Sequence, residues 1–126
     1  MNCKVLIVVF VAVFAFATKS FSQTIDCAHA RTQTDMNFCA QKEYEAADKE
    51  LNVLYKSIIA KLTPSQKTIL ILSQRKWISY RDGYCKIYAS VYEGGSIASG
   101  IISGCKTGTT RARISELKEL YSQVSR

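Results

Sequence analysis

Apolar side chains recur at steps of three and four through the middle of the chain, which is the spacing of one helical face. This stripe starts near Thr34 or Asp35, which are good helix caps, and Lys, Glu and Asp occupy the other face. Its members are Met36, Ala40, Tyr44, Ala47, Leu51, Leu54, Ile58 and Leu62. Pro64, the single proline, suits the first turn of a new helix. The pattern therefore predicts two consecutive helices that meet in a turn at Pro64.

The second predicted helix runs from about Ser65 toward Tyr88 or Tyr92, and a third begins near Thr109 or Thr110. Between them, residues 93–109 contain scattered glycines and are predicted to form an ordered loop, while residues 23–33 form an arm. No segment has the alternating pattern of a strand. We predict an all-α fold, in which a long antiparallel helical hairpin carries a shorter third helix.

Two polar residues interrupt the apolar stripe of the second helix. Gln74 and Arg81 occupy positions where a core-facing helix is usually apolar, and burying them without partners would cost several kcal/mol. In an antiparallel hairpin that turns at Pro64, Arg81 comes level with Asp48 and Gln74 comes level with Asn52. We expect an ion pair between Asp48 and Arg81 and a contact between Asn52 and Gln74. These four residues form a predicted structural network that fixes the helix register.

The first 22 residues have the pattern of a signal peptide. Lys4 precedes an apolar run from Val5 to Ala17, which is shorter than the about 20 residues of a membrane-spanning helix. The small residues Ser20 and Ser22 suit cleavage before Gln23. The remaining domain, residues 23–126, has 15 basic and 10 acidic residues, so its net charge is +5. We expect a periplasmic or secreted protein without stable membrane insertion.

Four cysteines remain after the predicted signal peptide: Cys27, Cys39, Cys85 and Cys105. An even number in a small exported chain is typical of disulfides, here two bonds with three possible pairings. Cys39–Cys85 would clasp the open end of the hairpin. The local pairs Cys27–Cys39 and Cys85–Cys105 instead close short loops worth roughly 3 kcal/mol each. We favour the local pairs, and the other pairings stay open.

The residues that carry chemistry favour binding over catalysis. No nucleophile and base form an evident set, and with His29 as the single histidine we expect no metal, cofactor or enzymatic activity. A glycine-rich loop between helices can enter a partner's cleft, although a plain connecting loop is the alternative. The candidate partner-binding residues are Tyr92, Glu93, Gly94, Gly95, Ser96 and Ile97. The basic surface would attract anionic wall or lipid material, and an exported chain is not expected to bind nucleic acid.

The ordered motifs of the chain resemble the LprI-type lysozyme-inhibitor domain of bacterial periplasmic proteins and lipoproteins. The resemblance rests on Cys27–Ala30, Thr32–Asn37 with Cys39, Tyr44–Asn52 with Tyr55–Lys56, Gln74–Asp82 with Cys85, and Glu93–Ser96 with Cys105, Thr110, Arg113 and Leu117. It covers nearly all of residues 23–126. The resemblance implies a cysteine-bearing helical domain outside the cytoplasmic membrane that is linked to lysozyme inhibition, and it identifies no inhibitory residue.

Two hypotheses follow for the function. The first is an exported binding module that blocks a lysozyme-like or other cell-wall-degrading enzyme, through a protein–protein contact. The alternative is an envelope or stress module that binds anionic cell-wall or lipid material and has no enzyme target.

Overall fold

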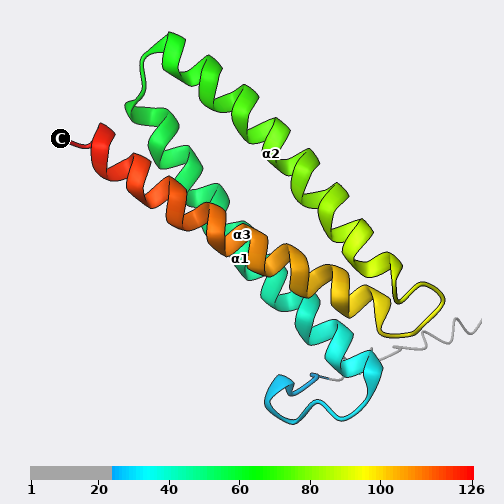
Figure 1. Ribbon diagram of the computed structural model, residues 1–126. Coiled ribbons are helices and arrows are strands. Elements are labelled where there is room, and N and C mark those ends of the chain that lie inside the picture. The colour runs from blue at the N-terminus through cyan, green and yellow to red at the C-terminus, as the bar shows by residue number, and fades with distance from the viewer. Residues whose placement is uncertain (1–23) are drawn as a thin grey trace, which may run out of the picture.

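The computed structural model describes residues 24–126, and the predicted signal peptide 1–22 lies outside these residues. A short 3-10 helix, η1 (Cys27–His29), is followed by three α-helices: α1 (Gln33–Lys61), α2 (Pro64–Ser90) and α3 (Ala98–Val124). The described part of the chain contains no strand, so the predicted all-α fold is confirmed. Figure 1 shows that the chain reverses direction between α1 and α2 and again between α2 and α3.

Local sequence sets the starts of the first two helices. Thr32 caps α1 in a reciprocal arrangement with Asp35, so that each side chain accepts a hydrogen bond from the other residue's backbone N–H. Thr63 and Gln66 form the same capping box at α2, and Pro64 occupies its first turn, as the sequence predicted. Because Thr32 is the cap, α1 begins slightly earlier than the predicted Thr34 or Asp35.

The third helix differs from the prediction. It begins at Ala98 instead of Thr109 or Thr110, and with 27 residues it is as long as α2. The expected loop over residues 98–109 and the expected shorter third helix were therefore wrong. The buried face of this extra stretch is made of small polar residues, Ser103 and Thr107, which produce no hydrophobic periodicity.

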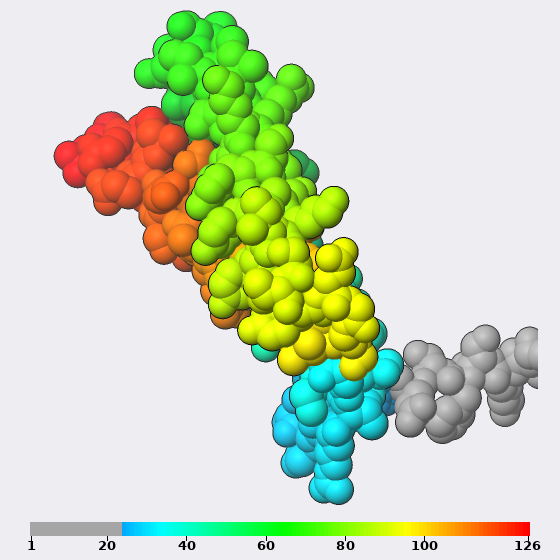
Figure 2. All heavy atoms as spheres, turned by 45° about the vertical axis from the view of Figure 1, so that its right-hand side comes forward, coloured from blue at the N-terminus to red at the C-terminus, as the bar shows by residue number. Residues whose placement is uncertain are grey.

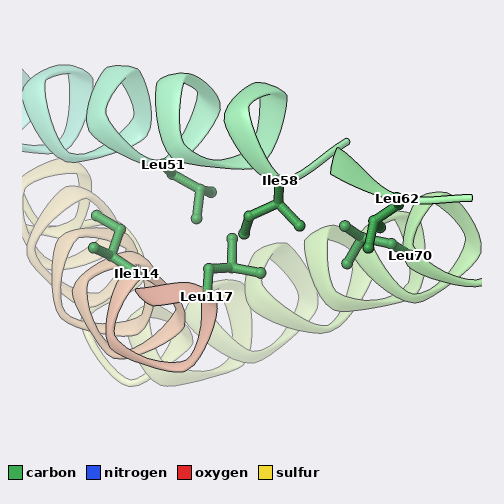
Figure 3. Packing of buried hydrophobic residues seen from close by; sticks show 6 residues of the cluster. All are labelled: Leu51, Ile58, Leu62, Leu70, Ile114 and Leu117. Carbon is green, nitrogen blue, oxygen red and sulfur yellow. The ribbon is translucent and has the colours of Figure 1, made fainter. Parts of the chain in front are cut away.

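α3 is the element that holds the other two helices together. It packs against both α1 and α2, most extensively against α1, whereas α1 and α2 have little direct contact beyond the turn that joins them. The apolar core lies between the helices near this turn and comprises Leu51, Ile58, Leu62, Leu70, Ile114 and Leu117 (Figure 3). The rest of the interface is more polar, because the buried residues there include Arg81, Ser103 and Thr107.

Two disulfides brace the end of the molecule farther from the α1–α2 turn. Cys27 is bonded to Cys39, which fixes η1 to α1, and Cys85 is bonded to Cys105, which joins α2 to α3. This is the local pairing that the sequence analysis favoured, and it excludes the Cys39–Cys85 clasp. None of the helices within residues 24–126 is both long and apolar enough to cross a lipid bilayer.

Candidate functional site

The connection between α2 and α3, residues 91–97, forms a compact tip at one end of the bundle. It contains all six predicted partner-binding residues, from Tyr92 to Ile97, and every residue of the tip is exposed. Backbone hydrogen bonds close it as successive turns, including Gly95 N–H to the Tyr92 carbonyl at 3.0 Å. Gly94 has a φ of 80°, in the left-handed region that favours glycine. The tip is therefore an ordered turn structure and not an extended loop.

The tip is also fixed to the first helix. The Asn37 side-chain amide of α1 donates a hydrogen bond of 2.7 Å to the Ser96 carbonyl, and Gln33 holds Asn37 by donating to its Oδ1 at 2.8 Å. Gly100 lets the two elements approach, because a Cβ there would lie 2.5 Å from Asn37 Oδ1. Figure 2 shows the yellow atoms around this connection directly beside the cyan start of α1. With the Cys85–Cys105 bond at its base, the tip is held from both sides.

The surface of the tip is mainly apolar and continues onto α2. Val91 is 78% exposed, Tyr92 and Ile97 are each about two-fifths exposed, and Glu93 is the single charged residue among residues 91–97. The rings of Tyr80, Tyr84 and Tyr88 follow one another along α2, with centroids 5.7 and 6.3 Å apart. Exposed aromatic and aliphatic side chains on an ordered scaffold are typical of protein-binding surfaces.

The structural polar network centres on Arg81, which is 5% exposed. Its Nη1 donates to Asp48 at 3.1 Å, so the predicted pair across α1 and α2 is present in the structure. Its Nε donates to Asp82 at 2.9 Å, and Nη1 also contacts the Thr110 hydroxyl of α3 at 3.5 Å. The guanidinium carbon lies 5.3 Å from the ring centroid of Tyr44 and 5.1 Å from that of Trp77. All three helices thus converge on one buried cation.

Burial and charge perturb the pKa values of this network. Burial alone would raise the pKa of Asp82, but hydrogen bonds from Arg81 and Lys106 outweigh it and lower the pKa below its ordinary value. Burial raises the pKa of Tyr44, with Arg81 opposing and Asp48 reinforcing the change. The lowered pKa keeps the Asp82 carboxylate ionised beside Arg81, and the raised pKa keeps Tyr44 protonated.

The other predicted contact, between Asn52 and Gln74, is replaced by different hydrogen bonds. Asn52 donates to the Asp48 side chain at 3.0 Å, within α1. Gln74 Oε1 accepts from Arg113 of α3 at 3.1 Å. The difference follows from the position of α3, because α3 packs against α2 and its Arg113 supplies Gln74 with a partner that a two-helix register could not reveal.

A groove with a volume of about 510 Å³ opens between α1 and α2, on the polar network. Its α1 wall is formed by Tyr44, Asp48, Leu51, Asn52 and Tyr55, and its α2 wall by Ile71, Gln74, Arg75, Ile78 and Arg81. An adjoining hollow of about 570 Å³ shares Tyr44, Asp48 and Asn52 and adds Lys49 and Lys56. All four predicted network residues therefore border one open groove.

Several site residues escaped the sequence analysis. Lys106 lies in the part of α3 that was predicted as a loop, and Thr110 lies at the predicted start of that helix; neither was assigned to the Arg81 network. Tyr80 and Tyr84 have a signal that could have found them, since with Tyr88 they recur at four-residue spacing on one helix face. His29 lies in η1 and pairs at 2.7 Å with the exposed Asp26, away from the groove. Within residues 24–126, no cluster of His, Cys, Asp and Glu has the arrangement of a metal site.

Comparison with known proteins places the chain among bacterial relatives. The model of a family described as "Lysozyme inhibitor LprI" matches residues 26–117. The chain belongs to the LprI family. It is also 39% identical, over 112 residues, to an uncharacterized protein of Rhizobium meliloti (strain 1021), covering 79% of this chain and 81% of the relative. No solved structure matches. The LprI match spans both disulfides, the tip and the Arg81 network.

Proposed function

We propose that the chain is an exported binding module that inhibits a lysozyme-like, cell-wall-degrading enzyme by inserting its tip, residues 91–97, into the enzyme's substrate cleft. Membership of the LprI family supports a lysozyme-inhibitor-like function, and two disulfides are typical of proteins outside the reducing cytoplasm. The observation that carries the proposal is the tip itself, which is exposed, mainly apolar and held by α1, α2 and α3.

The rigidity of the tip favours tight binding. A loop that is ordered before it binds loses less conformational entropy on association, so a larger part of the contact energy appears as affinity. The Asn37–Ser96 hydrogen bond and the Cys85–Cys105 disulfide provide this order without occupying the exposed side chains. Tyr92 is the strongest candidate anchor, because a tyrosine combines a large apolar ring with a hydroxyl that can form hydrogen bonds.

Charge sets a constraint on the contact. Animal lysozymes are basic as a class, and residues 23–126, the predicted exported domain, have a net charge of +5. Long-range repulsion would therefore slow association unless the contact surface is locally neutral or acidic. The tip meets this condition because its single charged residue is Glu93. The proposal consequently predicts that Glu93→Lys slows association with a basic lysozyme more than it changes folding.

The direct test is the lysis of bacterial cells, followed by turbidity, with lysozymes of the c, g and i types and the oxidised protein. Tyr92→Ala and Ile97→Ala should each raise the inhibition constant roughly 5- to 150-fold, corresponding to about 1–3 kcal/mol for an interface anchor. Ile69→Ala is the matched control, since Ile69 is exposed near the start of α2, at the end of the helix opposite to the tip. Equal effects of Ile69→Ala and Ile97→Ala would exclude the tip as the inhibitory element.

The same experiment separates the two hypotheses. Absence of inhibition of every lysozyme class at micromolar protein, together with salt-sensitive retention on isolated cell walls, would favour an envelope module that binds anionic material.

A further inference from the structure

The groove between α1 and α2 contains hydrogen-bond donors that the fold does not use. Arg81 has Nε and Nη1 occupied by Asp82 and Asp48, and among residues 24–126 its Nη2 has no hydrogen-bond partner. Gln74 accepts from Arg113 through Oε1, and its Nε2 likewise has no partner in the described residues. Two side chains that are more than nine-tenths buried thus each retain a free donor.

These donors are open to a ligand. Within residues 24–126, no fully enclosed side-chain nitrogen or oxygen lacks a partner, so Nη2 of Arg81 and Nε2 of Gln74 must both reach solvent. Both residues line the groove of about 510 Å³. The cost of burying a guanidinium is offset only when its donors form hydrogen bonds. An acceptor that binds to the open Nη2 therefore forms a charge-assisted hydrogen bond, which is stronger than one between neutral groups.

The charge around the groove favours an anion. Arg75 adds a second guanidinium to the α2 wall, and Lys49 and Lys56 line the adjoining hollow together with Glu45, whose carboxylate is paired with Lys42 at 2.8 Å. Asp48 opposes an anion, although its carboxylate is already paired with Arg81 at 3.1 Å. Asp82 is bound by both Arg81 and Lys106. The remaining attraction favours a carboxylate, one oxygen of which can accept a charge-assisted hydrogen bond from Nη2 of Arg81.

The positions of the two residues on α2 describe the rest of the ligand. Gln74 and Arg81 are seven residues apart, so their backbones are separated by about 10 Å along the helix axis. A ligand that satisfies both therefore carries a carboxylate and, at a distance, a second acceptor such as an amide carbonyl. Tyr44, Tyr55 and Ile78 line the same groove and offer apolar contact to the part between these groups. Such a ligand is small and partly apolar.

We propose that the α1–α2 groove binds a small N-acylated carboxylic acid, whose carboxylate pairs with Arg81 and whose amide carbonyl accepts a hydrogen bond from Gln74. Two sources share this chemistry: an N-acetylated sugar acid of a glycan and the acylated carboxyl end of a short peptide. The proposal is independent of lysozyme inhibition, because the residues that carry it are not part of the tip.

Titration by two-dimensional NMR tests the proposal on the protein exported by its host cell and purified with both disulfides formed. The ligands are N-acetylmuramic acid and N-acetyl-alanyl-alanine, and the neutral controls are N-acetylglucosamine and N-acetyl-alanyl-alanine amide. At least one acid should shift the signals of residues 44–55 and 71–81 in a saturable manner, and the matching neutral compound should bind at least tenfold more weakly. The acid that binds identifies the source.

A matched pair of variants on α2 tests the location without disturbing the core. Arg75→Gln and Lys76→Gln remove the same charge from neighbouring exposed positions, but Arg75 lines the groove and Lys76 does not. Arg75→Gln should weaken binding at least fivefold, and Lys76→Gln should leave it unchanged. The proposal is overturned if neither acid gives a saturable shift, if the neutral compounds bind equally well, or if both variants weaken binding to the same extent.

Discussion

The substitution Asp48→Ala tests whether the Arg81 network determines the stability of the fold. It removes the carboxylate at 3.1 Å from Nη1 and leaves that nitrogen with the Thr110 hydroxyl at 3.5 Å. The guanidinium cannot give up its proton near neutral pH, so the variant keeps a buried charge that has lost one of its two carboxylates. The perturbation is therefore the loss of charge compensation in a site where all three helices meet.

The magnitude follows from burial. Removing one partner of a fully buried ion pair costs about 3–5 kcal/mol. Here the Asp48 side chain is 37% exposed and Asp82 still binds Nε at 2.9 Å, so water and the second carboxylate replace part of the loss. We expect a decrease of about 2–3 kcal/mol in the free energy of unfolding, a large part of the margin of a small domain. The melting temperature should fall by about 10–20 °C.

Thermal and urea unfolding followed by circular dichroism, with both disulfides intact, measure this loss. Glu50→Ala is the matched control, because Glu50 also lies on α1 and forms an ion pair across helices, with Lys118 at 3.0 Å, but both partners are more than half exposed. An exposed pair contributes about 0–1 kcal/mol. If the two variants unfold within about 0.5 kcal/mol of each other, the reasoning about the buried network is wrong.

Two further predictions concern the tip and the pH dependence of stability. Gly104→Ala should stabilise the protein by up to about 1 kcal/mol, because alanine has the higher helix propensity and its Cβ would meet no atom within 4 Å. Gly100→Ala should lose this gain, because its Cβ would displace Asn37 from the tip. Equal melting temperatures of the two variants would contradict this prediction. Because the folded pKa of Asp82 lies below its ordinary value of about 3.9, the stability it contributes is present above about pH 4 and is lost as the pH falls through the folded pKa. Asp82→Asn should make the melting temperature less sensitive to pH between 4 and about 2, and an unchanged profile would refute the assignment.

The sequence predicted those parts of the fold that depend on local signals. Pro64 predicted the position of the turn, and from that turn the rise per residue was sufficient to bring Asp48 level with Arg81. The start of α3 could not be predicted in the same way. Gly100 and Gly104 have low helix propensity, and the buried residues of that stretch are small and polar, so the helix is stabilised by tertiary packing and by the Cys85–Cys105 bond.

The candidate site was likewise predictable only where a local sequence signal exists. The tip was visible as a glycine-rich segment, but its attachment to Asn37 depends on an approach of α1 and α3 that no local pattern records. The groove was also hidden, because a hairpin of two helices in direct contact would have closed it. It exists because α3 packs against both α1 and α2 and leaves them with little direct contact.

The most direct test of the central proposal is to map the contact on an inhibited lysozyme by hydrogen exchange, with and without a short N-acetylglucosamine oligomer in the substrate cleft. The proposal predicts that the backbone amides of residues 92–97 become protected in the complex and lose this protection when the oligomer occupies the cleft. Protection confined to other residues, or a complex that forms equally well with the cleft filled, would contradict it.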